Sequence, residues 1–307
     1  MNPLQSPEVL FADEYNRPLF QMGPYDNAAM ARNFDLVRAA KTTPELDWSA
    51  YFGAGGAFTL TVNGREAIDL ALNELRLRPD DEVLIVTTTG GPYISRCVTD
   101  LITARCRWSR APGPRTRAIF LIHEFGFPAA LSAELLALGL PIIEDCAYAL
   151  GTAGAGGVGD YVVYSFSKAL PLPYGGLLKS PRPPARASLL SGQARHETPI
   201  LLDPYLRGRQ AAFTRRREVF EIYRERFAAE GLSPLLTPEP GTVPHSFLVA
   251  LEDQARAEAM RPKLHAAGII SSVFFGGGGY FLPNHQSLSD AAIDYIVAQF
   301  MAAWHGG

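Results

Sequence analysis

The sequence predicts an α/β protein with a mostly parallel central sheet, helices on both of its faces, and a smaller α+β unit at the C-terminal end. Four continuous apolar runs of strand length lie between residues 82 and 166. Such runs are typical of parallel strands that are buried on both faces. A proline-rich segment, SPRPPA (180–185), then precedes a change in character toward a strongly basic helix. The 307 residues, 47% of them hydrophobic, are enough to bury a full core.

Within the first half of the chain the elements follow in a regular order. Residues 1–50 show weak periodicity, and we expect an N-terminal arm with short helices there. FTLTV (58–62) is a strand candidate, and residues 64–77 place apolar side chains on one helical stripe. A helix over residues 128–139 is expected to end at Gly139. The four apolar runs are expected to form strands at 82–86, 117–122, 140–145 and 161–166.

The second half predicts a separate, smaller unit. Its elements are a basic helix (214–231), a strand (245–251), a helix (255–268), a strand (271–275) and a last helix (289–304) that starts at a serine cap. We therefore expect an arm at 1–50, a large domain at 51–205 and a small domain at 206–307.

Composition limits the classes of partner. A net charge of −3 provides no general attraction to nucleic acid or to an anionic membrane. No apolar stretch approaches the ~20 residues that span a bilayer, and the first fifteen residues carry acids where a signal peptide would be basic. Cys97, Cys106 and Cys146 are an odd number without metal-ligand spacing, which favours reduced thiols. These features predict a soluble, cytoplasmic protein without a metal site.

The segment Asn63-Gly64-Arg65-Glu66 joins a predicted strand to a predicted helix. Asn63 can cap the helix, with Glu66 placed to reach back to it. Gly64 allows a close approach of the backbone, and the free amides of a first helical turn bind anions. A well-capped helix without any ligand explains the same four residues.

Two further positions follow apolar strands. Asp145 ends one strand, where the ligands of open α/β sheets bind, although a helix cap or a metal ligand fits a lone acid equally well. Lys168 follows the next strand, and burial would lower the pKa of its amine and make it nucleophilic. Ser165, three residues earlier, is placed to donate its hydroxyl to a phosphate, and Gly175 and Gly176 leave room for backbone near a bulky ligand. A surface lysine at a strand end is the alternative.

Lysine is rare in this chain. Lys41, Lys168, Lys179 and Lys263 are the only lysines, so Lys+Arg 28 leaves 24 arginines. Lysine can release a proton where arginine cannot, although codon bias also explains the ratio.

Four motifs in this order resemble the sugar aminotransferases of the DegT/DnrJ/EryC1/StrS family, which use pyridoxal 5'-phosphate (PLP) on the fold type I scaffold of aspartate aminotransferase. They are NGREAIDLAL (63–72), IHEFGFPA (122–129), IEDCAYALGT (143–152) and SFSKALPLPYGG (165–176). PHSFLV (244–249) and LPNHQSLSDAAIDYIV (282–297) are similar to the family's small-domain strand and last helix. The resemblance covers most of the chain.

The resemblance implies a role for each candidate. Lys168 would hold PLP as a Schiff base and move a proton as general base and acid, and Asp145 would pair with the pyridine nitrogen. The helix turn at Gly64 and Arg65 would bind the cofactor phosphate. His123 and Tyr148 are candidates for the phenolic oxygen of the cofactor or for the substrate, and His123 can equally be a packed strand-end histidine.

Several segments depart from the family pattern, and the chain resembles a shortened member. The loop after strand 82–86 lacks the aromatic residue that usually stacks on the pyridine ring, and Tyr93 is the nearest one. Tyr148 stands where glutamine or histidine is common. Residues 102–117 look too short for a strand and its connecting helix, and four glycines (276–279) replace a longer substrate-contacting segment.

The expected function is amino transfer from glutamate or glutamine to a keto group of a nucleotide-linked sugar, in a homodimer whose subunits share their active sites. Other PLP chemistry, such as dehydration or elimination, is one alternative. Lys168 argues against the family's sugar dehydratases, which carry histidine there. A non-catalytic binding or regulatory role is another alternative, and the presence of both Asp145 and Lys168 argues against it.

Overall fold

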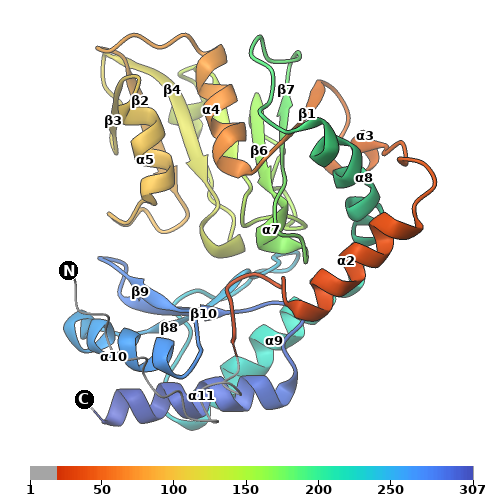
Figure 1. Ribbon diagram of the computed structural model, residues 1–307. Helices are drawn as coiled ribbons and strands as arrows, with labels where there is room; N and C mark the ends of the chain where they lie inside the picture. The colour runs from red at the N-terminus through yellow and green to blue at the C-terminus, as the bar shows by residue number, and fades with distance from the viewer. Residues whose placement is uncertain (1–18, 307) are drawn as a thin grey trace, which may run out of the picture.

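Two sheets organise the protein, which we describe from a computed structural model over residues 19–306. The larger sheet has seven strands in the order β1-β7-β6-β5-β4-β2-β3, and the smaller has three in the order β8-β10-β9. Four neighbouring pairs of the larger sheet are parallel, and only the pairs of β7 with β1 and with β6 are antiparallel. The predicted α/β class with a mostly parallel sheet is therefore confirmed (Figure 1).

Five of the seven strands of the larger sheet, β1, β2, β4, β5 and β6, correspond to strands predicted from the sequence. The seven are β1 (Ala57–Thr61), β2 (Glu82–Thr87), β3 (Arg107–Ser109), β4 (Thr116–Ile122), β5 (Ile142–Asp145), β6 (Tyr161–Ser165) and β7 (Gly176–Ser180). Alternate side chains enter different cores because successive residues of a strand face opposite sides. In β4, Phe120 packs among residues of α4 (Gly64–Glu74) and α5 (Arg96–Thr103), while Leu121 packs with Leu84 in a separate cluster.

The other helices of this part are short or lie at its border. They are α2 (Asn27–Ala39), α3 (Trp48–Phe52), the 3-10 turn η1 (Glu124–Gly126), α6 (Ala133–Leu136), α7 (Phe166–Ala169) and α8 (Gly192–Arg207). Side chains of α8, among them Leu202 and Leu206, share a core with Tyr164 of β6 and Leu177 of β7. Helices thus cover both faces of the sheet, as buried parallel strands require.

A small antiparallel sheet forms the second part, with β8 (Ser246–Ala250), β9 (Ser272–Phe274) and β10 (Gly279–Pro283). The helices α9 (Arg209–Ala229), α10 (Gln254–Ala266) and α11 (Asp290–His305) pack on it (Figure 1). Phe20 of the N-terminal arm joins this part, because its amide donates to the carbonyl of Gly268 at 2.7 Å and its carbonyl accepts from Ile270 at 2.9 Å. We propose the predicted division at residue 205, with one sheet on each side of it.

Some expected elements differ from the structure. The helix predicted for residues 128–139 is only the single turn α6, which begins after a Ser132 cap. Residues 102–117 do contain a strand, the three-residue β3. The strands β7 and β10 and the helices α5 and α8 were not predicted, because glycines and prolines obscure the periodicity of β7, β10 and α8. None of the helices within residues 19–306 is long and apolar enough to cross a membrane.

Candidate active site

A cavity of about 440 Å³ is lined by residues at the carboxyl ends of β2, β4, β5 and β6, among them Thr87, Ile122, Asp145 and Ser165. The small sheet lies beyond this end of the larger sheet (Figure 1). Parallel strands bring their carboxyl ends to one edge of a sheet, so residues far apart in sequence meet there. All seven site residues predicted from the sequence line this cavity: Gly64, Arg65, His123, Asp145, Tyr148, Ser165 and Lys168.

The first turn of α4 opens onto the cavity. Asn63 caps the helix by accepting from the amide of Glu66 at 3.0 Å, as predicted. The Glu66 carboxylate does not return to Asn63 but accepts from the amide of Val62 at 2.6 Å. Within the described residues, the amides of Gly64 and Arg65 donate to no protein acceptor. Free amides at the start of a helix attract an anion such as a phosphate.

Ser165 lies directly against this turn. A side chain on Gly64 would place its Cβ 3.0 Å from the Cβ of Ser165, so glycine is what allows the contact. Gly176 has a related role, since a Cβ there would lie 2.5 Å from the backbone carbon of Asn63. The paired glycines thus make room for the backbone that starts α4. For Gly176, this close approach of backbone is the role that the sequence predicted.

Asp145 is almost fully buried at the end of β5, and burial raises the pKa of its carboxyl group even though the nearby Lys168 ammonium opposes the shift. One oxygen, Oδ1, accepts from the amide of Ala147 at 2.9 Å. A buried carboxylate with a single protein donor is costly unless a cationic or proton-bearing group reaches it. The site therefore favours a ligand with a protonated nitrogen at this position.

Lys168 is half-buried in the one-turn helix α7, directly after β6. Its Nζ lies 3.5 Å from the centroid of the Tyr148 ring. Burial acts to lower the pKa of the ammonium group, but Tyr148 and Asp145 together raise it above its ordinary value. The sequence-based expectation of a lowered pKa is thus wrong for the protein without a ligand. The two oxygen-bearing side chains stabilise the charged amine.

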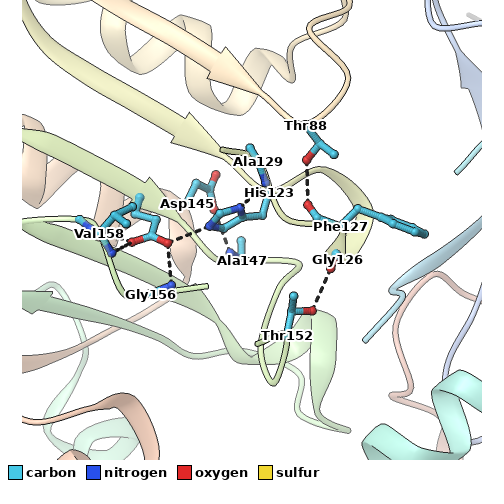
Figure 2. Close-up of polar contacts among 12 residues, drawn as sticks. Thr88, His123, Gly126, Phe127, Ala129, Asp145, Ala147, Thr152, Gly156 and Val158 are labelled. Atoms are coloured by element: carbon cyan, nitrogen blue, oxygen red, sulfur yellow. Dashed lines mark hydrogen bonds and ion pairs between the residues drawn. The ribbon is translucent and has the colours of Figure 1, made fainter. Parts of the chain in front are cut away.

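His123 has both ring nitrogens in contact with protein atoms (Figure 2). Nε2 lies 2.8 Å from Oε1 of Glu144, and Nδ1 accepts from the amide of Ala129 at 2.9 Å. The ring is 2% exposed. The sequence left His123 either as a contact of the cofactor or substrate or as a packed strand-end histidine. Because both ring nitrogens already contact protein atoms, this geometry favours the packed histidine.

Glu144 organises the loop below the site. Its two carboxylate oxygens also accept from the amides of Gly156 (2.6 Å), Val158 (3.0 Å) and Gly159 (2.7 Å). His123, Glu144 and Cys146 lie close enough to suggest metal ligation by geometry alone. Because the Glu144 oxygens already accept these bonds and His123 uses both nitrogens, the cluster works as a hydrogen-bond network.

Glu124 is a site residue that the sequence analysis did not identify. It lines the cavity, and its Oε2 accepts from the amide of Thr89 (2.7 Å) and from the Thr89 hydroxyl (2.8 Å). Burial raises the pKa of this carboxyl group. Glu124 directly follows His123 in the segment IHEFGFPA (122–129). An acidic residue in such an apolar segment is the sequence signal that could have identified it as a site residue.

Cys97 is a second residue of the cavity wall that was not predicted, and it pairs with the predicted Arg65. Nη2 of Arg65 lies 2.7 Å from Sγ of Cys97, and Ser95 caps α5 by accepting from the amide of Cys97 in the first turn. Partial burial acts to raise the pKa of the thiol, but the hydrogen bonds from Arg65 and Ser95 lower it overall. Tyr93, from the same loop, also lines the cavity and packs edge-on against Phe274.

The donor set fits PLP. The free amides of α4 and the hydroxyl of Ser165 suit a phosphate. The buried carboxylate of Asp145 suits a protonated pyridine nitrogen, and the amine of Lys168 lies in the same cavity. The volume of the cavity lies in the range of small-molecule sites.

Comparisons with known proteins point the same way. Residues 109–180 match the profile of the DegT/DnrJ/EryC1/StrS aminotransferase family. The chain is 28% identical over 266 residues to a UDP-N-acetyl-3-dehydro-alpha-D-glucosamine 3-aminotransferase of Acidithiobacillus ferrooxidans, covering 73% of this chain and 70% of that protein. It is 31% identical over 148 residues to a dTDP-3-amino-3,4,6-trideoxy-alpha-D-glucose transaminase of Micromonospora megalomicea subsp. nigra, covering 40% and 38%.

Solved structures extend the likeness to the whole fold. The aminotransferase TlmJ of Streptoalloteichus hindustanus superposes with a TM-score of 0.73 at 19% identity, covering 94% of this chain and 100% of that one. A Streptococcus pneumoniae protein in its PMP-form superposes with a TM-score of 0.71 at 17% identity, covering 94% and 98%. By the profile match and the two relatives, this chain is similar to the DegT/DnrJ/EryC1/StrS aminotransferases, and the solved structures share its fold.

Proposed function

We propose that this protein is a PLP-dependent aminotransferase that moves an amino group from an amino acid to a keto group of a nucleotide-linked sugar. One observation carries the proposal: the Lys168 amine, the Asp145 carboxylate and the open first turn of α4 share one cavity. The relatives named for UDP- and dTDP-linked sugars support the class of acceptor. Glutamate or glutamine is the donor that the family resemblance implies.

PLP, when bound, supplies a carbonyl carbon that accepts amines and a ring that withdraws electrons. Gly64 and Arg65 would hold its phosphate with their backbone amides, and Ser165 would add its hydroxyl. Asp145 would keep a proton on the ring nitrogen. Lys168 would be the point of covalent attachment, and its Nζ would move a proton from and to the substrate carbon that bears the amine.

The raised pKa of Lys168 fits this cycle. In the protein without a ligand, Tyr148 and Asp145 stabilise the ammonium form. If Asp145 paired with the ring nitrogen of the cofactor, its carboxylate would stabilise the Lys168 ammonium group less. The Nζ then keeps only the Tyr148 ring at 3.5 Å and becomes easier to deprotonate.

Covalent capture tests the attachment point. We expect the purified protein to bind PLP, and borohydride to fix the cofactor on the peptide that contains Lys168. Lys168→Ala should lose this label and at least about 100-fold of the amine transfer rate, in the range of a lost proton-transfer group. Lys179→Ala is the matched control, because Lys179 lies on β7 and donates to the carbonyl of Phe52 at 3.3 Å. A label that survives in Lys168→Ala would overturn the assignment.

A second measurement separates amine transfer from its alternatives. Addition of glutamate or glutamine should convert the cofactor to its amine form, seen by a change in the absorption spectrum. A keto sugar linked to UDP or dTDP should then reverse the change. Release of ammonia or water without that cycle would favour elimination or dehydration, and no response to any donor would favour a binding role.

We further propose a cytoplasmic homodimer whose subunits complete each other's sites. Large exposed apolar side chains, Phe34 on α2 (64% exposed) and Leu189 (78% exposed), support a protein interface. Sedimentation should show a dimer that Phe34→Asp or Leu189→Asp weakens, whereas Leu136→Asp should leave it intact. A monomer with full activity would contradict shared sites. The free thiols of Cys97, Cys106 and Cys146 support a reducing compartment.

A further inference from the structure

Arg216 of α9 is the most deeply buried cation of the described chain, with 2% of its surface exposed. Its guanidinium donates to four acceptors. Nη2 reaches the carbonyls of Lys168 (3.2 Å) and Ala169 (3.1 Å), Nη1 reaches the carbonyl of Asn284 (3.0 Å), and Nε reaches Oε1 of Gln286 (2.9 Å). Two of these acceptors thus belong to α7, the turn that carries Lys168.

The charge of Arg216 is not neutralised by an acid. Within the described residues its partners are three carbonyls and one amide oxygen, and burial lowers the pKa of its guanidinium to about 9. Burying a cation costs several kcal/mol unless its hydrogen bonds are made. If position 216 served only to fill the core, a neutral side chain would avoid this desolvation cost. The four hydrogen bonds of Arg216 therefore indicate a role other than packing.

His245 holds the same carbonyl. Its Nε2 lies 2.6 Å from the oxygen of Lys168. Burial, together with the charges of Arg216 and Lys168, keeps the pKa of this imidazole well below its ordinary range. The ring is therefore neutral, and because a carbonyl only accepts, Nε2 carries the proton and donates it. The carbonyl of Lys168 thus receives two donors.

Both donors come from the second part of the molecule. Arg216 lies on α9 and His245 directly precedes β8, whereas Lys168 follows β6 of the larger sheet. Gln286 makes a further hydrogen bond between the two parts, because its Nε2 donates to the carbonyl of Ala169 at 3.1 Å. Residues from α9, from the position before β8 and from the segment after β10 thus hold the C-terminal end of α7, where unpaired carbonyls suit a cation.

We propose that Arg216 is a positioning residue for the reaction: with His245 it clamps the backbone of Lys168 from the small-sheet side and so sets where the reactive amine sits in the cavity. This inference rests on Lys168 as the cofactor attachment point. The helix α7 is a single turn and cannot define the position of Lys168 by itself. A displacement of about 1 Å in a reacting group can slow a reaction roughly 100-fold.

The rate of PLP capture by the cofactor-free protein tests the clamp without any turnover. Stopped-flow absorbance would follow capture, and borohydride trapping with mass spectrometry would confirm Lys168 as the labelled residue. Arg216→Met keeps an unbranched, flexible side chain but removes all four contacts, and we expect capture to slow at least about tenfold per folded molecule. Arg216→Lys keeps a donor and a charge and should recover part of the rate.

Arg217→Met is the matched control. Arg217 is the next residue of the same helix, and its Nε also donates to a carbonyl, that of Thr242, at 2.9 Å. It does not touch α7. We expect capture within about twofold of the wild-type rate, although both methionine variants lose charged hydrogen bonds and should unfold more easily.

If Arg216→Met does not fold, Gln286→Ala tests the clamp on Lys168 instead. It removes one acceptor of Arg216 and one donor to Ala169 while three contacts of the guanidinium remain. Capture should slow about threefold in a folded protein. Equal capture rates for Gln286→Ala, Arg216→Met and Arg217→Met would reject the clamp and leave a structural role. A wild-type protein that captures no PLP would instead reject the proposed function, and the two failures are distinct.

Discussion

The ammonium group of Lys168 lies over the face of the Tyr148 ring, 3.5 Å from its centroid, and His245 meets the same ring edge-on at 4.3 Å between centroids. The negative face of an aromatic ring stabilises a cation there. Tyr148 therefore contributes to the charge state of Lys168 as well as to the wall of the cavity.

Tyr148→Phe should lower the pKa of Lys168 because the ring stays while the phenol oxygen, which raises this pKa, is removed. Reductive methylation of the cofactor-free protein reports the neutral amine, and peptide mass spectrometry would follow its rate against pH. The midpoint for Lys168 should move to lower pH in the variant. Lys179 in the same digest is the internal reference, and an unchanged Lys168 profile would show that the hydroxyl has no influence.

Glu144→Gln should destabilise the protein by about 2–3 kcal/mol, since charge-assisted hydrogen bonds to His123 and to the loop amides are lost. Burial acts to raise the pKa of Glu144, but these donors lower it overall. A lowered folded-state pKa stabilises above the unfolded value, and this stability is lost as the pH falls through the folded value. Urea titrations at pH 7 and pH 4 should show the wild-type advantage shrinking toward acid, and a constant difference would contradict this account.

Glu124→Gln should have the opposite pH dependence. Burial raises the pKa of Glu124, so its contribution is complete below the unfolded pKa and is lost as the pH rises through the folded one. The amide can still accept from Thr89, so the variant should gain thermal stability relative to wild type on going from pH 4 to pH 7. A gain of about 2 °C in the difference between melting temperatures is resolvable. Glu144→Gln is the paired comparison, and the same trend in both variants would be inconsistent with the two environments.

Cys97 should be the most reactive thiol. Hydrogen bonds from Arg65 and Ser95 lower its pKa, whereas burial raises the pKa of Cys106 and Cys146. Iodoacetamide at neutral pH should label Cys97 at least about tenfold faster than the other two, because the thiolate is the nucleophile. Arg65→Met should slow this labelling, with Arg96→Met, an exposed neighbour of Cys97, as the control. Labelling of Cys106 or Cys146 first would contradict the assigned pKa order.

Strong local patterns explain what could be predicted. The apolar runs at 82–86, 117–122 and 161–166 correspond to β2, β4 and β6 within one residue at each end, because a strand buried on both faces leaves an unbroken apolar signal. The Ser289 cap before α11 was predicted for the same kind of local reason. The helix predicted for residues 128–139 was too long because alanine and leucine favour a helix in any context. In the structure, Pro128 and the packing of Leu131 and Leu135 against the sheet limit the helix to the single turn α6.

The sequence by itself determined the α/β class, the order of the motifs, and the seven residues that line one cavity, because each depends on short-range patterns and on strand ends that a parallel sheet gathers at one edge. Only the tertiary structure decided the charge of Lys168, the engaged nitrogens of His123, and the contacts of Arg216 and Glu124. These depend on partners up to 70 residues away in the chain, whose distances set the electrostatic interaction and the desolvation. No periodicity in a sequence encodes that proximity.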